Sequence, residues 1–87
     1  MIEKAEAVIH LELPSERESR IVYRALKPET ESPPSQRSRV YIELDGRTLT
    51  LKFEATDTTA LRAALNSYLR WIMLVDNLYS TVESLLG

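Results

Sequence analysis

The sequence contains no cysteine and only two glycines in 87 residues. Without cysteine, neither a disulfide nor a thiolate metal site can add stability, and an ordinary reducing cytosol is permitted. A turn described below accounts for Gly46, so no group of glycines remains for a phosphate-binding loop or a dinucleotide fingerprint. We therefore expect no nucleotide cofactor and no metal site.

Histidine is almost as scarce, since His10 is the only one. The residues around it alternate in polarity, which places it on the polar face of an edge strand beside Glu6 and Glu12. A catalytic base or a metal ligand needs partners close by, so an ordinary surface histidine is the simpler interpretation. No serine or carboxylate has an oriented base beside it either. The sequence predicts a protein that is not an enzyme.

Long apolar runs are also missing. Charged side chains such as Arg62, Arg70 and Asp76 interrupt the most apolar stretch, so no run of about 18 apolar residues could span a membrane. No secretory signal is visible after Met1, and we expect a soluble protein. The net charge of −2 and the pI of 5.4 are unlike those of a self-sufficient nucleic-acid binder, so any nucleic-acid role must be local or shared.

Three segments alternate between apolar and polar residues, which predicts strands over 5–13, 39–44 and 48–55. The pair Asp45-Gly46 between the last two is typical of a two-residue hairpin turn in which both residues have positive φ. A hairpin centred there sends the apolar side chains of both strands to one face. It also predicts two facing pairs, which are Ile42 with Leu49 and Val40 with Leu51.

A short helix follows the first strand. Ser15, with Glu18 three residues later, forms the capping-box pattern of a helix start. We expect this helix to end at about Lys27, because the residue before Pro28 is disfavoured in the helical region. Residues 28–38 include three prolines and no aliphatic side chain, which predicts a mobile surface loop.

The last predicted element is a long helix that begins after its cap, Asp57, and runs almost to Gly87. The order strand, helix, strand, strand, helix, with a right-handed crossover after the first strand, leaves every neighbouring pair of strands antiparallel. We therefore predict one α+β domain over residues 1–87. It is a two-layer sandwich with both helices on one face of a three-stranded antiparallel sheet, and residues 48–55 form the central strand.

The long helix carries more apolar surface than one small core can cover. One stripe at helical spacing is expected to pack on the sheet: Leu61, Leu65, Tyr68, Ile72, Val75, Tyr79, Val82 and Leu86. A second stripe runs beside it, and its small members, Ala60, Ala64 and Ser67, would let the first helix approach closely. The rest of it either packs on that helix or overhangs it and meets a partner. The predicted partner interface consists of Trp71, Leu74, Leu78 and Leu85.

Two segments resemble the family of the small dimerisation subunit of the KEOPS complex. They are residues 54–72, which include the run LRAALNSYLRWI, and residues 21–29, IVYRALKPE. The resemblance covers essentially the whole chain. It implies a non-catalytic subunit of the complex that installs the threonylcarbamoyl group on adenosine 37 of tRNA. It further implies a homodimer that bridges two catalytic ATPase-fold subunits, assists tRNA binding and works in the cytoplasm or also the nucleus.

A basic stripe on the first helix has two readings. Its members, Arg17, Arg20, Arg24 and Lys27, recur at helical spacing and could contact tRNA phosphates. They could equally form a solvated helix face that Glu16 and Glu18 partly neutralise. The stripe is also the basis of an alternative function, an independent small RNA-binding module. Whether a homodimer would form by helix packing or by pairing of sheet edges stays open.

Overall fold

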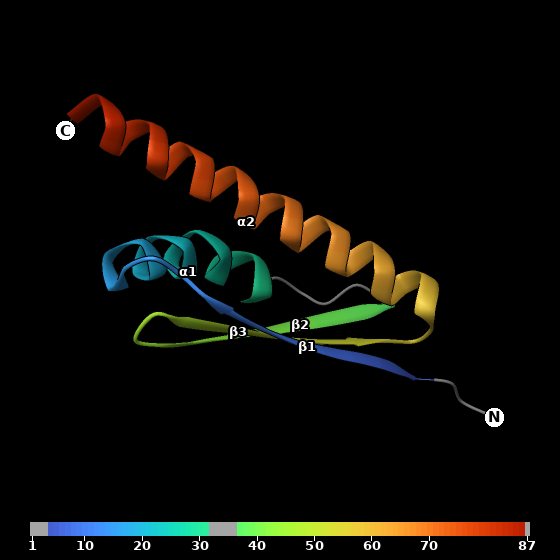
Figure 1. The fold of residues 1–87 in the computed structure, drawn as a ribbon. Helices are drawn as coiled ribbons and strands as arrows, with labels where there is room; N and C mark the ends of the chain where they lie inside the picture. Colours follow the sequence, from blue (N-terminus) through green and yellow to red (C-terminus); the bar gives the residue numbers. More distant parts are fainter. Residues whose placement is uncertain (1–3, 32–36, 87) are drawn as a thin grey trace.

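The fold is a three-stranded antiparallel sheet with two helices on one of its faces. The computed structural model describes residues 4–31 and 37–86. Along the chain the elements are β1 (Ala5–Glu12), α1 (Glu16–Glu31), β2 (Ser38–Asp45), β3 (Thr48–Ala55) and α2 (Thr58–Leu86). The sheet order is β1-β3-β2, and both helices lie on the same side of it (Figure 1). The predicted α+β class, element order and central strand are confirmed.

The core lies between the helices and the face of the sheet that they cover. The side chains of Leu49, Leu51 and Phe53 on β3 are fully buried there, because a central strand has a neighbour on each side and helices above it. Val22 of α1 and Ile72 of α2 also belong to this core. Fully burying one such side chain contributes about 1.5–3 kcal/mol. The alternation that predicted the strands therefore also identified their buried face.

The predicted turn residues were wrong by one position. Asp45 pairs with Thr48, so the two central residues of the turn are Gly46 and Arg47. Gly46 has a φ of 60° and no other described residue has a positive φ, which is the pattern of a type II′ turn with glycine first. In this turn Asp45 does not need to adopt the left-handed conformation. The strand register moves by two residues, which keeps every side chain on its predicted face.

The corrected facing pairs of the hairpin are Ile42 with Leu51 and Val40 with Phe53. Leu49, predicted opposite Ile42, pairs with Leu44 instead. The apolar face of the sheet is unaffected, because an even shift preserves the alternation.

The first helix is longer than predicted. The Glu18 amide donates to Ser15 Oγ at 3.1 Å, as expected for the cap, but α1 continues through Pro28 to Glu31. Proline removes one helical donor, and the last turn is held in part by Thr30 Oγ1, which donates to the Lys27 carbonyl at 2.8 Å. Pro28 thus does not end the helix. Of the predicted loop, residues 28–31 are helical, Ser38 begins β2, and residues 32–36 lie outside the described residues.

The start of α2 is fastened to the start of β2. The Ala60 amide donates to Asp57 Oδ1 at 2.7 Å, which confirms Asp57 as the helix cap. Arg37 Nη2 lies 3.1 Å from both carboxylate oxygens of Asp57, and the Thr56 amide donates to the Arg37 carbonyl at 2.9 Å. These contacts set the direction in which α2 leaves the sheet.

Candidate interaction surface

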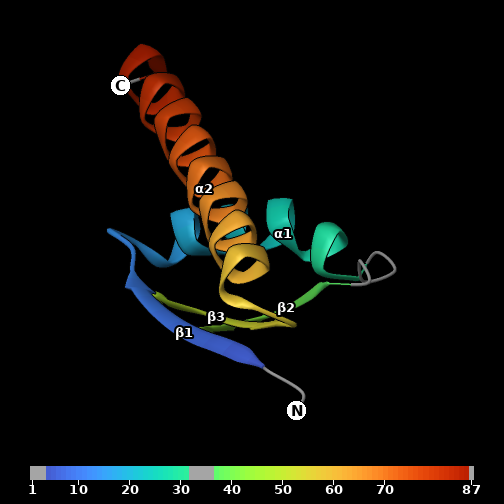
Figure 2. The ribbon, with the colours of Figure 1, turned by 90° about the vertical axis from the view of Figure 1, so that its right-hand side faces the viewer.

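The C-terminal part of α2 extends beyond the body of the molecule. The helix has 29 residues and is therefore about 43 Å long, whereas a strand of eight residues spans about 26 Å. Val75 is the last residue of α2 that packs on the core. Beyond Asp76, residues 77–86 form a projecting segment that rises away from the sheet (Figures 1 and 2). The longest dimension of the molecule is 55 Å.

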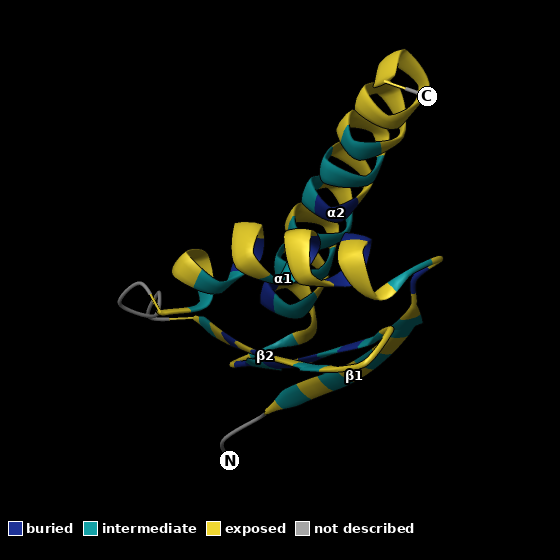
Figure 3. Ribbon diagram, turned by 90° about the vertical axis from the view of Figure 1, so that its left-hand side faces the viewer, coloured by how far each residue is buried: buried dark blue, intermediate teal, exposed yellow. Residues whose placement is uncertain are grey.

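Three of the four predicted interface residues are exposed on α2. The exposed fractions of Leu74, Leu78 and Leu85 are 56%, 59% and 81%. At about 100° per residue they lie within one narrow arc of the helix. We call these three residues the apolar strip. Figure 3 shows that the projecting segment carrying most of it is exposed around nearly its whole circumference.

Trp71, the fourth predicted interface residue, is less exposed than the other three. Its side chain is half-buried and packs against the edge of the core. Its ring stands 6.5 Å from that of Tyr68, centroid to centroid, and Tyr68 in turn meets Phe53 edge to face at 5.7 Å. Trp71 therefore joins the core to the apolar strip.

The stripe expected on the sheet reaches the core only in part. Val82 and Leu86, which were predicted to pack on the sheet, are 51% and 81% exposed. They belong to the projecting segment, which rises away from the sheet (Figure 1). Met73 is also exposed, and sequence reasoning did not single it out because it lies outside both stripes. Met73 and the stripe ends widen the exposed apolar surface of α2 beyond the predicted interface.

The basic stripe lies mostly in solvent on α1. Arg17, Arg20 and Arg24 are exposed, and within residues 4–31 and 37–86 they form no ion pair. Lys27 is half-buried, and its Nζ stands 5.8 Å from the centroid of the Tyr23 ring, a cation–π distance. Three of the four predicted cations are thus available to a polyanion, while Lys27 also has an aromatic partner in its own helix.

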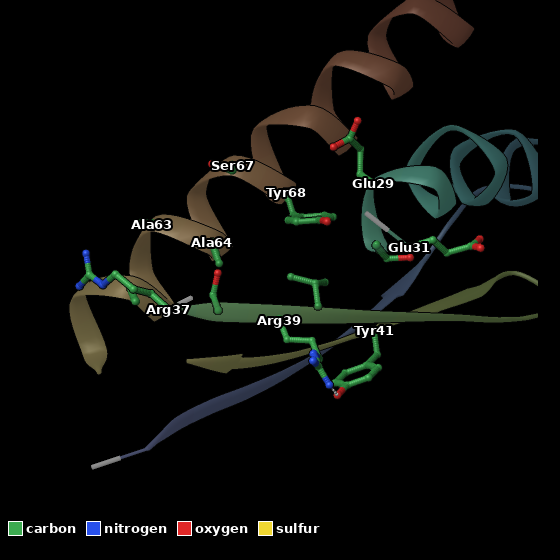
Figure 4. A pocket seen from close by; sticks show the side chains of 13 residues that line it. Glu29, Glu31, Arg37, Arg39, Tyr41, Ala63, Ala64, Ser67 and Tyr68 are labelled. Carbon is green, nitrogen blue, oxygen red and sulfur yellow. Dashed lines mark hydrogen bonds between the residues drawn. The ribbon is translucent and has the colours of Figure 1, made fainter. Parts of the chain in front are cut away.

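A cavity of about 620 Å³ separates part of α1 from α2. Its walls come from the last turn of α1, the start of β2 and the first half of α2 (Figure 4). Ala60, Ala64 and Ser67 line it, so these small side chains border a shared space with α1. Tyr68 also lines it, and burial together with the charge of Glu29 raises the pKa of its phenol. The phenol is therefore a neutral hydrogen-bonding group there.

His10 has the surface position that its sequence predicted. It is exposed on β1, and its Nδ1 lies 2.9 Å from Thr50 Oγ1. In the described part of the chain, no three His, Asp or Glu side chains are grouped so that they could hold a metal ion. None of the helices described there is long and apolar enough to cross a membrane.

These features define a small two-layer α+β protein whose second helix projects beyond the core and carries exposed apolar residues. Its residues 6–79 match a family model described as "Transcription factor Pcc1". The KEOPS complex subunit Pcc1 of Pyrococcus abyssi (strain GE5 / Orsay) is 42% identical over 69 residues, which are 79% of this chain and 84% of that protein. The chain therefore belongs to the Pcc1 family, as its sequence resemblance indicated.

A solved structure supports the fold independently. The chain superposes on one chain of the crystal structure of the binary complex Gon7-Pcc1 with a TM-score of 0.78. The superposition covers 90% of this chain and 95% of that chain, at 18% sequence identity. At this identity the likeness concerns the arrangement of the elements. Leu85 and Leu86 lie beyond the residues that the family model matches, whereas Leu74 and Leu78 lie within them.

Proposed function

We propose that this chain is a non-catalytic KEOPS subunit that dimerises and bridges two catalytic ATPase-fold subunits. In this role it assists tRNA binding during threonylcarbamoylation of adenosine 37. The Pyrococcus abyssi relative is a KEOPS complex subunit, and the family resemblance implies the dimerising and bridging role. Work in the cytoplasm, or also in the nucleus of a eukaryote, is part of the same proposal.

The observation that carries the proposal is the apolar strip on α2. More than half of each of Leu74, Leu78 and Leu85 is exposed, and Leu78 and Leu85 lie on the projecting segment, beyond the last core residue of α2. Each leucine that becomes fully buried in an interface gains about 1.5–3 kcal/mol. These three residues lie on one arc of the helix, and Trp71 precedes them where α2 still packs on the core. Together they form a continuous apolar surface of a kind that is uncommon on monomers.

The contribution to tRNA binding rests on Arg17, Arg20 and Arg24. Contacts to phosphates need only local positive charge, so they are compatible with the net charge of −2. The same charge makes the alternative of an independent RNA-binding module the weaker one. A shared role, in which a larger partner supplies most of the positive surface, agrees better with three exposed arginines on one short helix.

The decisive experiment replaces one strip residue by glutamate. Leu78→Glu places a charge where the partner must bury an apolar side chain, so binding to the purified catalytic subunit should weaken by at least 100-fold, corresponding to about 3 kcal/mol or more. Leu74→Glu should have a similar effect. Isothermal titration calorimetry measures the affinity, and circular dichroism at the same concentration checks that the variant is folded.

Ser80→Glu is the matched control. Ser80 is exposed in the same projecting segment, but at about 100° per residue it lies on the opposite side of α2 from Leu78. The control should bind the catalytic subunit like the wild type. Normal binding by both leucine variants would show that the strip does not meet the catalytic subunit and would overturn this part of the proposal.

A further inference from the structure

An exposed seam runs along the outer side of α2. It consists of the apolar strip together with Ala63, Ser67, Arg70 and Thr81, and all of these residues are exposed. Each member follows the one before it by three or four positions, so at about 100° per residue the whole set lies within an arc of about 80°. From Ala63 to Leu85 the seam covers about 33 Å of helix. This is the length and spacing with which one helix packs along another.

The uncharged members of the seam are suited to burial against a second helix. Ala63 and Ser67 are small, which lets a second helix approach α2 closely. Both also line the cavity beside α1, so there is room for a partner side chain next to them (Figure 4). Thr81 Oγ1 donates to the Asn77 carbonyl at 2.8 Å, and this hydroxyl therefore keeps a hydrogen bond when water is excluded.

Arg70, in the middle of the seam, is its only charged member. Within residues 4–31 and 37–86 its guanidinium forms no ion pair. Its helical neighbours at three and four positions carry no charge: they are Asn66, Ser67, Met73 and Leu74. An intrahelical ion pair needs a carboxylate at one of these positions. Because burying an unpaired charge strongly opposes association, a protein that covers the seam must bring an acceptor for this guanidinium.

The seam of a second copy does not supply that acceptor. The carboxylates of α2 belong to Asp76 and Glu83. At about 100° per residue they lie about 160° and about 180° around the helix from Leu74, on the side opposite the seam. A parallel pair of helices with two-fold symmetry would even bring the two copies of Arg70 together. Packing of one seam on another therefore leaves Arg70 without a partner.

We infer that the seam packs along a helix of a different protein, and that this helix places a carboxylate opposite Arg70. The inference rests on the proposed function for the identity of that protein, the catalytic subunit, and adds the chemistry by which it is recognised. The leucines supply the apolar contact. The planar guanidinium, which can donate two parallel hydrogen bonds to one carboxylate, fixes how the two helices are aligned. A helix without the carboxylate is rejected because it would bury the charge of Arg70 unpaired.

The test is Arg70→Met, which replaces the guanidinium by an apolar side chain that is also a good helix former. This variant leaves the facing carboxylate buried without a partner, so binding to the purified catalytic subunit should weaken by about 100-fold or more. Unchanged or tighter binding would overturn the inference, because an apolar side chain suits a contact that contains no carboxylate. Isothermal titration calorimetry measures the affinity, and circular dichroism checks the fold of the variant.

Arg62→Met is the matched control. Arg62 is exposed on the same helix, but it lies outside the seam, about 120° around the helix from Leu74. This variant should bind like the wild type, and an equal loss would overturn the inference by showing that only the overall positive charge matters. On the catalytic subunit, one Asp→Asn or Glu→Gln change should weaken binding of the wild type but not weaken Arg70→Met further. If no carboxylate of that subunit behaves in this way, the inference is wrong.

Further results separate this inference from the proposed function. If Leu78→Glu loses the catalytic subunit while Arg70→Met keeps it, the interface stands and the carboxylate contact is wrong. If both variants bind normally, the proposed contact with the catalytic subunit fails as well. Light scattering of the isolated chain should give the same mass for Arg70→Met as for the wild type, and a different mass would place a second copy on the seam. Weaker tRNA binding by Arg70→Met, with normal binding of the catalytic subunit, would assign the guanidinium to a phosphate and also overturn the inference.

Discussion

At the scale of single residues, Asp57 combines two tasks at the start of α2. Its Oδ1 caps the helix by accepting from the Ala60 amide, and both of its oxygens face Arg37 at the start of β2. The Ala60 hydrogen bond lowers the pKa of Asp57 most, and Arg37 lowers it further. The ionised carboxylate is thus the form of Asp57 that the folded chain prefers.

Asp57→Ala should lower the unfolding midpoint temperature at neutral pH, because the variant loses the helix cap and the ion pair together. The contribution of Asp57 is present above its ordinary pKa of 3.8 and is lost as the pH falls through the lower pKa of the folded chain. The difference between the variant and the wild type should therefore shrink on acidification. Thermal scans at pH 7 and pH 2.5 measure it.

Asp57→Asn separates the two tasks. Asparagine is also a good helix cap, so this variant keeps an acceptor for the Ala60 amide while it removes the charge opposite Arg37. It should be more stable than Asp57→Ala at pH 7. Equal stabilities of the two variants would show that the cap contributes little.

At the scale of elements, α1 contains a proline, Pro28, without ending there. Pro28 lies in the last turn, so the helix loses only the one donor that would reach the Arg24 carbonyl. Pro28→Ala should restore that bond, and we expect the unfolding free energy to rise by about 1–2 kcal/mol once the greater freedom of the unfolded chain is subtracted. Urea denaturation followed by circular dichroism measures this change.

Arg24→Ala is a suitable comparison for Pro28→Ala, since it alters an exposed side chain of the same helix without changing its backbone bonds. Its stability should stay within about 0.5 kcal/mol of the wild type. If Pro28→Ala were instead destabilised, the proline would be fixing the path of the chain out of α1 more strongly than it weakens the helix.

At the scale of the whole molecule, the proposed homodimer has two candidate routes. The apolar strip offers helix packing, and β1 and β2 are both edge strands of an open sheet. The monomer has a mass of 10.0 kDa. Light scattering of the isolated chain at micromolar concentration should give about twice this mass if the proposed dimer forms.

The Leu78→Glu variant distinguishes the two routes. A monomer mass for this variant, with a dimer mass for Ser80→Glu, would assign the self contact to the strip. A dimer mass for both variants would show that the homodimer does not form through the apolar strip. The edge strands of the sheet would then be the next candidate interface. A wild-type mass near 10 kDa throughout the concentration range would contradict the homodimer.

Much of the fold could be predicted because its signals are local. The alternation around Leu51 identifies a strand and its buried face, and Ser15 and Asp57 satisfy helix amides only a few residues away. The errors have local causes as well. Pro28 does not end α1, because a proline in the last turn removes only one helical donor. The hairpin turn lies at Gly46 and Arg47, one residue later than predicted.

The candidate site was predictable only in part. Leu74, Leu78 and Leu85 could be singled out because one helix carries two apolar stripes. All three are exposed, and their contact with a partner stays a prediction. The half-buried position of Trp71, the exposure of Val82 and the burial of Glu18 could not be predicted. Each depends on where α2 rises away from the sheet and packs against α1. The periodicity of the sequence does not predict that position.

By itself the sequence determined the five elements, the buried face of the sheet, the helix caps, the lack of any cysteine and the surplus of apolar residues on α2. These properties follow from periodicity, composition and contacts within a few residues. Only the tertiary structure decided which part of that surplus is covered and that Glu18, a charged type of side chain, is buried. The physical reason is that burial depends on what lies opposite a side chain, and residues far apart in the sequence meet only after the layers have packed.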